Sequence, residues 1–215
     1  MTAFLALWND LRRGREAEYD EWHTREHVPE RVACPGFRRG RRYACADHPT
    51  HRWFTLYDVD DLSAFDTPAY RELIDRPTPW SASMRPDFRH FLRAPCTGIG
   101  DAGFGMGAGL AVLRLPDEAA LPALTALSVL PGMVRARLGR RAPATDAHRV
   151  GSGDSGASDD FASVLLLEAL DRGAAQHAFA NAAARFGAEA ASGGVYDLVF
   201  VFPAEPRERE AHRRG

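Results

Sequence analysis

The chain contains no lysine. Its 215 residues include 27 basic residues besides histidine, and every one of them is arginine. Enzymes that form a Schiff base with a substrate or with pyridoxal phosphate need a lysine amine, so those chemistries are excluded. Isoleucine is almost absent as well, with only Ile74 and Ile99, whereas alanine, glycine and arginine abound. This composition is typical of a high-GC bacterial genome.

Cysteine is also scarce. Only Cys34, Cys45 and Cys96 are present, and no C-x-x-C motif occurs. This argues against a disulfide framework or a zinc knuckle and fits a reducing cytoplasm, where we expect the protein. No apolar run approaches the roughly 20 residues that span a bilayer, and the N-terminal segment lacks the basic start of a signal peptide. With a net charge of −2, neither nucleic acid nor a membrane is expected as a partner.

Hydrophobic periodicity predicts the order β-α-β-β-α-β, which is ferredoxin-like, and predicts it twice. In the first copy we expect strands over residues 2–9, 37–46, 52–59 and 88–97, helices over 15–32 and 62–74, and a loop at 77–80. In the second copy we expect strands over 110–115, 134–142, 163–170 and 195–203, and helices over 117–129 and 174–186.

An internal repeat supports this division. The turn around Pro35-Gly36 recurs at Pro131-Gly132, 96 residues later, and an arginine-rich strand follows each turn. Self-similarity of this kind indicates a duplication. We expect a ferredoxin-like unit at 1–100 that holds the active site, a glycine-rich junction at 101–109, a degenerate second unit at 110–204 and a disordered tail at 205–215. The second copy's first helix has neither histidine nor an aromatic residue, so it is predicted to be structural.

The helix predicted over residues 15–32 is the most informative segment. At about 100° per residue, Tyr19, Trp22, His23 and Glu26 fall on one face, and His27 lies at its margin. A helix turns its apolar stripe toward the core, and burying ionisable groups there costs free energy unless they are paired or line a wet cavity. This helix is therefore predicted to form one wall of a pocket that holds acid–base groups.

The same residues allow other interpretations. The segment from His23 to His27 matches the H-x-x-E-H string of inverted zinc proteases, with two imidazoles on one face and Glu26 as base. Pro29 disturbs the helix at that point, and no partner helix offers a third ligand, so we predict no metal site. The Gly-Asp-Ser-Gly string at 153–156 has the composition of a flexible loop. The alternate glycines at 103–109 lack the strand and helix of a nucleotide loop.

Several residues outside this helix are candidates for binding a substrate. An inward arginine near the middle of the strand at 37–46 would orient an anionic or carbonyl group. Otherwise the arginines at 38–42 are expected at a solvated edge, in ion pairs with the acidic segment 16–21, and not in a nucleic-acid patch. Trp80, in the proline-rich loop at 77–80, would either cover the pocket as a lid or pack against the core. The sequence favours neither alternative. The candidates are Trp22, Arg42, Tyr43, Trp53, Trp80, Met84 and Arg85.

Two segments resemble the dimeric α+β barrel superfamily, and within it the EthD-like and RedY/HapK-like group of small bacterial proteins. One is residues 22–31, with Trp-His-x-x-Glu-His-x-Pro-Glu-Arg, and the other is residues 35–43, with Pro-Gly-Phe-x-Arg-Gly-Arg-Arg-Tyr. The resemblance implies two tandem ferredoxin-like units that form a barrel within one chain, in the α+β class. It also implies a ligand cavity between sheet and helices, and small aromatic substrates. Some branches need no cofactor, whereas others bind haem.

These observations predict a cofactor-independent enzyme of bacterial secondary metabolism that acts on a small aromatic intermediate. His27 or His23 would be the general base, because imidazole exchanges protons near neutral pH. Glu26 would orient the imidazole or relay the proton, and Arg42, Tyr43 or Arg85 would stabilise an oxyanion. The reaction would be a cyclisation, an isomerisation or an oxygenation. A haem- or metal-dependent monooxygenase and a non-catalytic binding protein are the alternatives, and a homodimer remains open.

Overall fold

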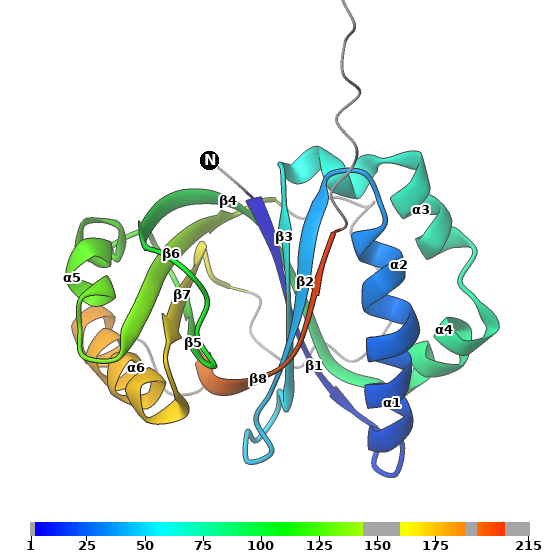
Figure 1. Cartoon of the computed structure of the whole chain (residues 1–215), viewed down its shortest axis with the longest axis horizontal. Helices are drawn as coiled ribbons and strands as arrows, with labels where there is room; N and C mark the ends of the chain where they lie inside the picture. The colour runs from blue at the N-terminus through cyan, green and yellow to red at the C-terminus, as the bar shows by residue number, and fades with distance from the viewer. Residues whose placement is uncertain (1–2, 144–159, 188–192, 205–215) are drawn as a thin grey trace, which may run out of the picture.

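The computed structural model describes residues 3–143, 160–187 and 193–204. Within them, antiparallel strands close into a barrel (Figure 1). In chain order the strands are β1 (Ala3–Leu11), β2 (Phe37–Ala44), β3 (Trp53–Val59), β4 (Phe88–Gly103), β5 (Gly109–Leu115), β6 (Met133–Arg141), β7 (Ser163–Ala169) and β8 (Gly193–Pro203).

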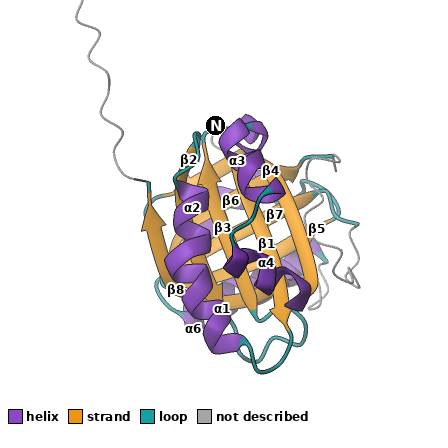
Figure 2. Ribbon diagram, turned by 90° about the vertical axis from the view of Figure 1, so that its right-hand side faces the viewer, coloured by secondary structure: helices purple, strands orange, loops and turns teal. Residues whose placement is uncertain are grey.

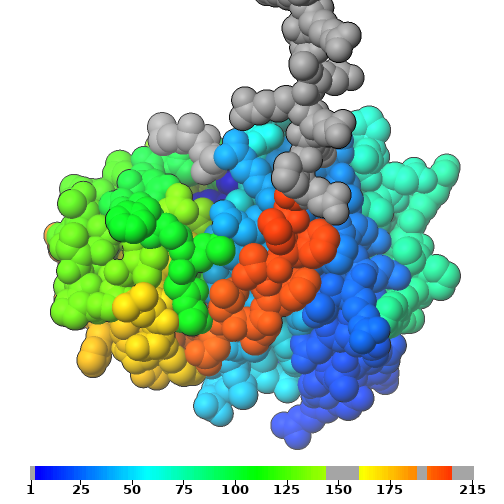
Figure 3. All heavy atoms as spheres, in the orientation of Figure 1, coloured from blue at the N-terminus to red at the C-terminus, as the bar shows by residue number. Residues whose placement is uncertain are grey.

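The order of the strands around the barrel shows the duplication directly. It runs β1-β3-β2-β8-β5-β7-β6-β4, so the first unit is β2-β3-β1-β4 and the second repeats it as β6-β7-β5-β8. Pairing of β2 with β8 and of β4 with β6 joins the units. Figure 3 shows the orange surface of β8 between the two units. The predicted α+β class and the tandem barrel are confirmed, and the halves pair within one chain.

Helices cover the barrel on two opposite sides (Figure 1). Figure 2 shows the helices of the first unit lying over its strands. No helix among the described residues is both long and apolar enough to pass through a bilayer. The helices are α1 (Glu16–Trp22), the π-helix η1 (His23–His27), α2 (Val28–Val32), η2 (Leu62–Asp66), α3 (Pro68–Asp75), α4 (Pro79–Met84), η3 (Arg85–Asp87), η4 (Leu121–Ala123), α5 (Leu124–Ser128) and α6 (Arg172–Phe186).

Strand alternation divides the apolar residues between the barrel interior and the two helix layers. On β3, Phe54 and Leu56 belong to the core inside the barrel. Tyr57 and Trp53 on the same strand pack instead on the helix side. The outward face of the first unit is therefore rich in aromatic residues, and it forms the floor of the cavity described below.

Four charged side chains pair across the barrel at inward-facing positions. Arg41 lies 3.0 Å from both Asp58 and Glu168, and Arg137 lies 2.7 Å from Asp58 and 3.4 Å from Glu168. All four are buried. The two arginines are 96 residues apart, the same offset as the two Pro-Gly turns. We call these residues the barrel quartet; it links strands of both units.

Two helices differ from the prediction because of proline. The helix expected over 62–74 is divided into η2 and α3, since Pro68 cannot donate a backbone hydrogen bond and Thr67 begins a new helix as its N-cap. The helix expected over 117–129 is reduced to η4 and α5, with Pro122 in its first turn.

Two other segments are more regular than predicted. The loop expected at 77–80 begins α4, because the Thr78 side chain accepts a hydrogen bond from the backbone of Ser81. The strand expected to end at residue 97 continues to Gly103 and pairs with β6. A side chain at Gly100 would lie 2.4 Å from Leu124, so glycine lets α5 pack closely on this strand. The string at 153–156 and the tail at 205–215 lie outside the described residues.

Candidate functional site

One helical stretch, α1–η1–α2, forms the wall of the site. Tyr19, His23, His27 and Arg31 follow one another at four-residue intervals. In an α-helix each such step overshoots a full turn by about 40°, so these side chains would spread around the helix. The π turn at residues 23–27 is wider and offsets that drift. All four side chains consequently line one cavity, including His27, which the sequence placed only at the margin.

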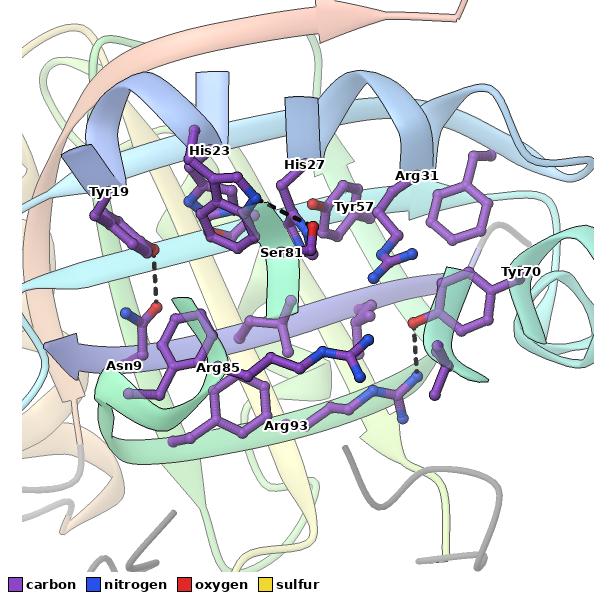
Figure 4. A pocket seen from close by; sticks show the side chains of 18 residues that line it. Asn9, Tyr19, His23, His27, Arg31, Tyr57, Tyr70, Ser81, Arg85 and Arg93 are labelled. Carbon is purple, nitrogen blue, oxygen red and sulfur yellow. Dashed lines mark hydrogen bonds between the residues drawn. The ribbon is translucent and has the colours of Figure 1, made fainter. Parts of the chain in front are cut away.

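The cavity lies between this helix, the α3–α4 segment and the outward face of β1, β3 and β4 (Figure 4). It contains about 720 Å³ of space free of protein atoms, including its open mouth. The part of this space that the centre of a water molecule can reach is about 70 Å³, so a ligand bound there must be small. Its walls are largely apolar, with Leu5, Leu7, Phe37, Phe88 and Phe91 among them.

Two imidazoles line this cavity. The ring centroids of His23 and His27 are 5.1 Å apart, and Nδ1 of each is buried without a hydrogen-bond partner. Burial, with the positive charge of Arg42 next, lowers the pKa of His23 well below its usual value. Burial, with Arg31 next, does the same to the pKa of His27. Both rings are therefore neutral at pH 7, and a neutral imidazole has one nitrogen able to accept a proton.

Glu26 lies beside the cavity but faces α4 rather than the imidazoles. Its carboxylate accepts hydrogen bonds from Trp22 Nε1 at 3.2 Å, Thr78 Oγ1 at 2.5 Å and Ser81 Oγ at 3.1 Å. No hydrogen bond in the described part of the chain joins it to His23 or His27. Glu26 therefore fastens α4 to the helix wall. The carboxylate next to His27 is instead Glu30, with Oε1 3.6 Å from Nδ1.

Of the seven predicted substrate-binding residues, Trp22 and Arg85 line the cavity. Trp22 Nε1 also donates a hydrogen bond to Ser81 at 3.1 Å. Arg42 is on the helix side of β2, where it pairs with Asp20 at 2.5 Å outside the cavity lining. This pair is the one expected with the acidic segment 16–21. Tyr43 belongs to the core inside the barrel, because neighbouring strand residues face opposite sides.

The other three predicted residues form a cluster next to the cavity. Trp53, Trp80 and Met84 pack together with Tyr19 and do not contribute to the cavity lining. Trp80 is half-buried, and its Nε1 donates to Glu18 at 3.2 Å. It therefore packs against α1, and α4 contributes Ser81 to the cavity instead.

Sequence reasoning missed the arginines Arg31 and Arg93 and the neighbouring hydroxyls of Tyr57 and Tyr70. All four line the cavity. Arg31 could have been predicted from the sequence, since it continues the four-residue spacing from His23. Arg93 was not, because it comes from β4, and only the closed fold brings that strand opposite the helix.

The described side chains offer no complete metal site, since no group of three His, Cys, Asp or Glu residues comes together in the ranges that the structure covers. They do not fit haem either. His23 is only 5% exposed, and its ring packs between Tyr19 at 4.9 Å and Trp22 at 5.4 Å. His27 lies 4.4 Å from the Trp22 ring. A porphyrin would have to displace these rings to reach either imidazole.

Comparison of the structure with solved structures gives full-length matches. An anthrone oxidase-like protein matches with a TM-score of 0.63 and 12% identity, over 94% of this chain and 93% of the other. A "putative monooxygenase" from Fusobacterium nucleatum matches with a TM-score of 0.57 and 10% identity, over 94% of each chain. A "putative chlorite dismutase" matches with a TM-score of 0.57 and 14% identity, over 93% and 96%. These neighbours belong to the dimeric α+β barrel superfamily.

This chain has the dimeric α+β barrel fold. No family model matches the sequence, and no curated protein matches it significantly. At such low identity the likeness establishes the fold alone. In this α+β barrel the cavity belongs to the first unit, between its sheet and its helices, as the resemblance had implied.

Proposed function

We propose that this α+β barrel is a cofactor-independent enzyme that oxygenates a small aromatic substrate, with His27 as general base and His23 beside it. One observation carries the proposal: two neutral imidazoles, one buried and one partly buried, each with an unpartnered nitrogen, lie in the wall of an apolar cavity. The names of two structural neighbours, an anthrone oxidase-like protein and a monooxygenase, favour oxygenation over cyclisation or isomerisation.

The chemistry begins with a proton transfer. His27 removes a proton from an acidic CH₂ group next to the aromatic ring, and Arg85 stabilises the enolate oxygen that forms. The electron pair of the carbanion adds to O₂, and the imidazolium returns its proton to give a C–OOH group. Loss of water from this hydroperoxide leaves a carbonyl. One CH₂ and one O₂ thus become one C=O and one H₂O.

The remaining groups bind the substrate and exclude water from the cavity. Trp22 and the phenylalanines of the cavity wall would stack on the aromatic substrate. Glu26 would act indirectly, because it holds Trp22 and α4 in position. We further propose that the chain is a member of the EthD-like and RedY-like group of bacterial secondary metabolism, because its Trp-His-x-x-Glu-His segment resembles that group.

The first test uses anthrone as substrate and follows oxygen consumption. His27→Ala should lower the rate roughly 100-fold or more, the usual contribution of a general base, and leave the melting curve unchanged. His177→Ala is the matched control, because this exposed histidine on α6 lies in the second unit. Full activity of His27→Ala with an unchanged melting curve would contradict the assignment.

A second test concerns the cofactor. Native mass spectrometry and an ultraviolet–visible spectrum of freshly purified protein should give the mass of the chain alone, without visible absorption. Stoichiometric haem or metal would make the imidazoles ligands and would refute a cofactor-free reaction.

A further inference from the structure

Three arginines from three different elements meet at one end of the cavity. Arg31 comes from α2, Arg85 from η3 and Arg93 from β4. In Figure 4 their guanidinium groups point toward the same space, below the Tyr57 hydroxyl and away from Tyr19. We call these three residues the arginine cluster. Three like charges in one apolar cavity repel one another, so their arrangement needs an explanation.

The cavity contains too little negative charge to balance this cluster. None of the described side chains that line it is an aspartate or a glutamate. Glu30 lies 3.7 Å from Arg31 Nη1, beyond hydrogen-bond distance, and burial raises the pKa of its carboxyl. Nη1 of Arg31 and of Arg93 is buried without a hydrogen-bond partner, and so is the Tyr57 hydroxyl. Glu30 and Asp75 offset only part of the cluster's positive charge, and buried donor groups without a hydrogen-bond partner cost free energy unless a ligand supplies one.

Neighbouring groups hold the arginine cluster in place. The guanidinium of Arg31 lies over the Tyr70 ring at 5.5 Å, and that of Arg93 lies over the Phe65 ring at 5.3 Å. Arg93 Nη2 also donates to the Tyr70 hydroxyl at 3.4 Å. Arg85 Nη2 donates to the Leu73 carbonyl at 3.2 Å. Stacked, tethered guanidinium groups lose little entropy on binding, so the cluster is preorganised.

We propose that the ligand of this cavity is an aromatic carboxylic acid, and that Arg31, Arg93 and the Tyr57 hydroxyl hold its carboxylate. Guanidinium groups bind planar carboxylates through paired charge-assisted hydrogen bonds. The apolar walls accommodate the aromatic part, and the carboxylate fixes which edge of the ring faces the imidazoles. Arg85 then remains for the enolate oxygen. This inference rests on the proposed function only in taking this cavity as the substrate site.

Calorimetric titration with two matched probes tests the proposal. The probes are 2-naphthoate and its neutral analogue 2-naphthamide, which have nearly the same shape. Naphthoate should bind at least about tenfold more tightly than the amide, because only the carboxylate brings a negative charge and two acceptor oxygens to the guanidinium groups. Arg31→Gln and Arg93→Gln should each remove most of that preference, and Arg93→Lys should restore part of it. Equal affinity for the two probes, or no naphthoate binding at millimolar concentration, would overturn the proposal.

Controls separate this proposal from folding and from catalysis. Arg89→Gln changes an exposed arginine on the same strand as Arg93 and should leave the preference intact. Circular dichroism checks each variant, and Arg31→Gln with native spectra but undiminished naphthoate preference would refute the role of Arg31. The titration needs no turnover, so an enzyme that fails to oxidise anthrone can still confirm the anion site. Hemin also carries carboxylates, and stoichiometric hemin binding without naphthoate binding would assign the cluster to a porphyrin instead.

Discussion

The two imidazoles show how burial sets chemistry at the scale of a residue. His23 and His27 lie among aromatic rings and near guanidinium groups, and both effects oppose a positive charge on the imidazole. Each pKa is lowered, so each ring stays neutral in the absence of ligand. A carboxylate bound at the arginine cluster would offset part of the positive field and raise the pKa of His27 toward the pH at which a general base works best.

The lowered pKa values predict how stability depends on pH. Between the folded pKa values and about 6.5, the unfolded chain binds more protons than the folded one. The free energy of unfolding should therefore rise with pH up to about 6.5 and then level off, with each histidine contributing up to about 1.4 kcal/mol per pH unit. His51, whose pKa burial lowers to about 4, adds to the same slope.

Urea unfolding of the double variant His23→Gln/His27→Gln between pH 4.5 and pH 7 separates these contributions, in a window that follows from the usual histidine pKa of about 6.5. Its stability should change less steeply with pH than that of the unchanged protein, while His51 acts equally in both. Two parallel curves would show that neither imidazole is held neutral by the fold.

At the scale of an element, the π turn decides which side chains reach the cavity. Upstream of it, Tyr19 faces the cavity, and downstream Val28 packs against Gly40 of β2. A side chain at Gly40 would lie 2.5 Å from Val28, so the helix lies directly on the strand there. Tyr19 and Val28 can face these two surfaces at the same time only because the π turn changes the rotation of one half of the helix relative to the other.

Inserting one alanine after Arg25 tests this role of the π turn. The side chain of Arg25 is 74% exposed, so few contacts are lost there, but the π turn already holds one residue more than an α-helical turn, and a further residue rotates the two halves of the helix relative to each other by about 100°. The position of Tyr19 in the cavity wall and the contact of Val28 with β2 can then not both be kept. We expect a loss of about 2 kcal/mol or more in the free energy of unfolding, comparable to exposing a buried apolar side chain. Arg25→Ala is the control and should stay close to the unchanged protein in the same urea titration.

At the scale of the whole molecule, the two units share both a barrel and a charge network. Arg41 and Arg137 occupy equivalent positions in the two copies, and each pairs with a carboxylate of either unit. Although burial opposes its ionisation, the two guanidinium groups hold the pKa of Asp58 well below its usual range. The barrel quartet therefore favours one alignment of the first unit on the second.

Breaking the barrel quartet should be costly. Arg137→Met leaves Asp58 and Glu168 with less positive charge in a buried site, and we expect a loss of about 3–5 kcal/mol in the free energy of unfolding. Arg140→Met is the matched control on the same strand. Its partner Glu118 is at the surface, and its own side chain is 59% exposed, so the cost should stay below about 1 kcal/mol. Equal melting temperatures for the two variants would contradict a structural role for the quartet.

The sequence by itself determined the two β-α-β-β-α-β units and the order of their strands along the chain. It also identified His23 and His27 as candidate residues of a pocket. Periodicity identifies strands and helices within a short window, and the 96-residue offset identifies the duplication. The same local information placed Tyr19, Trp22 and His23 on one face of a helix, and all three line the cavity. Local rules did not locate the π turn, so His27 was left at the margin.

Only the tertiary structure decided which residues from different elements meet. Arg93 and Arg31 are far apart in the sequence, and they line the same cavity only because β4 lies under the helix wall. Tyr43 and Arg42 are neighbours in the sequence, but one faces the barrel interior and the other the helices. Hydrophobic patterns fix the local period of a segment, whereas the closure of the barrel fixes which face of each strand is inside and what lies opposite it.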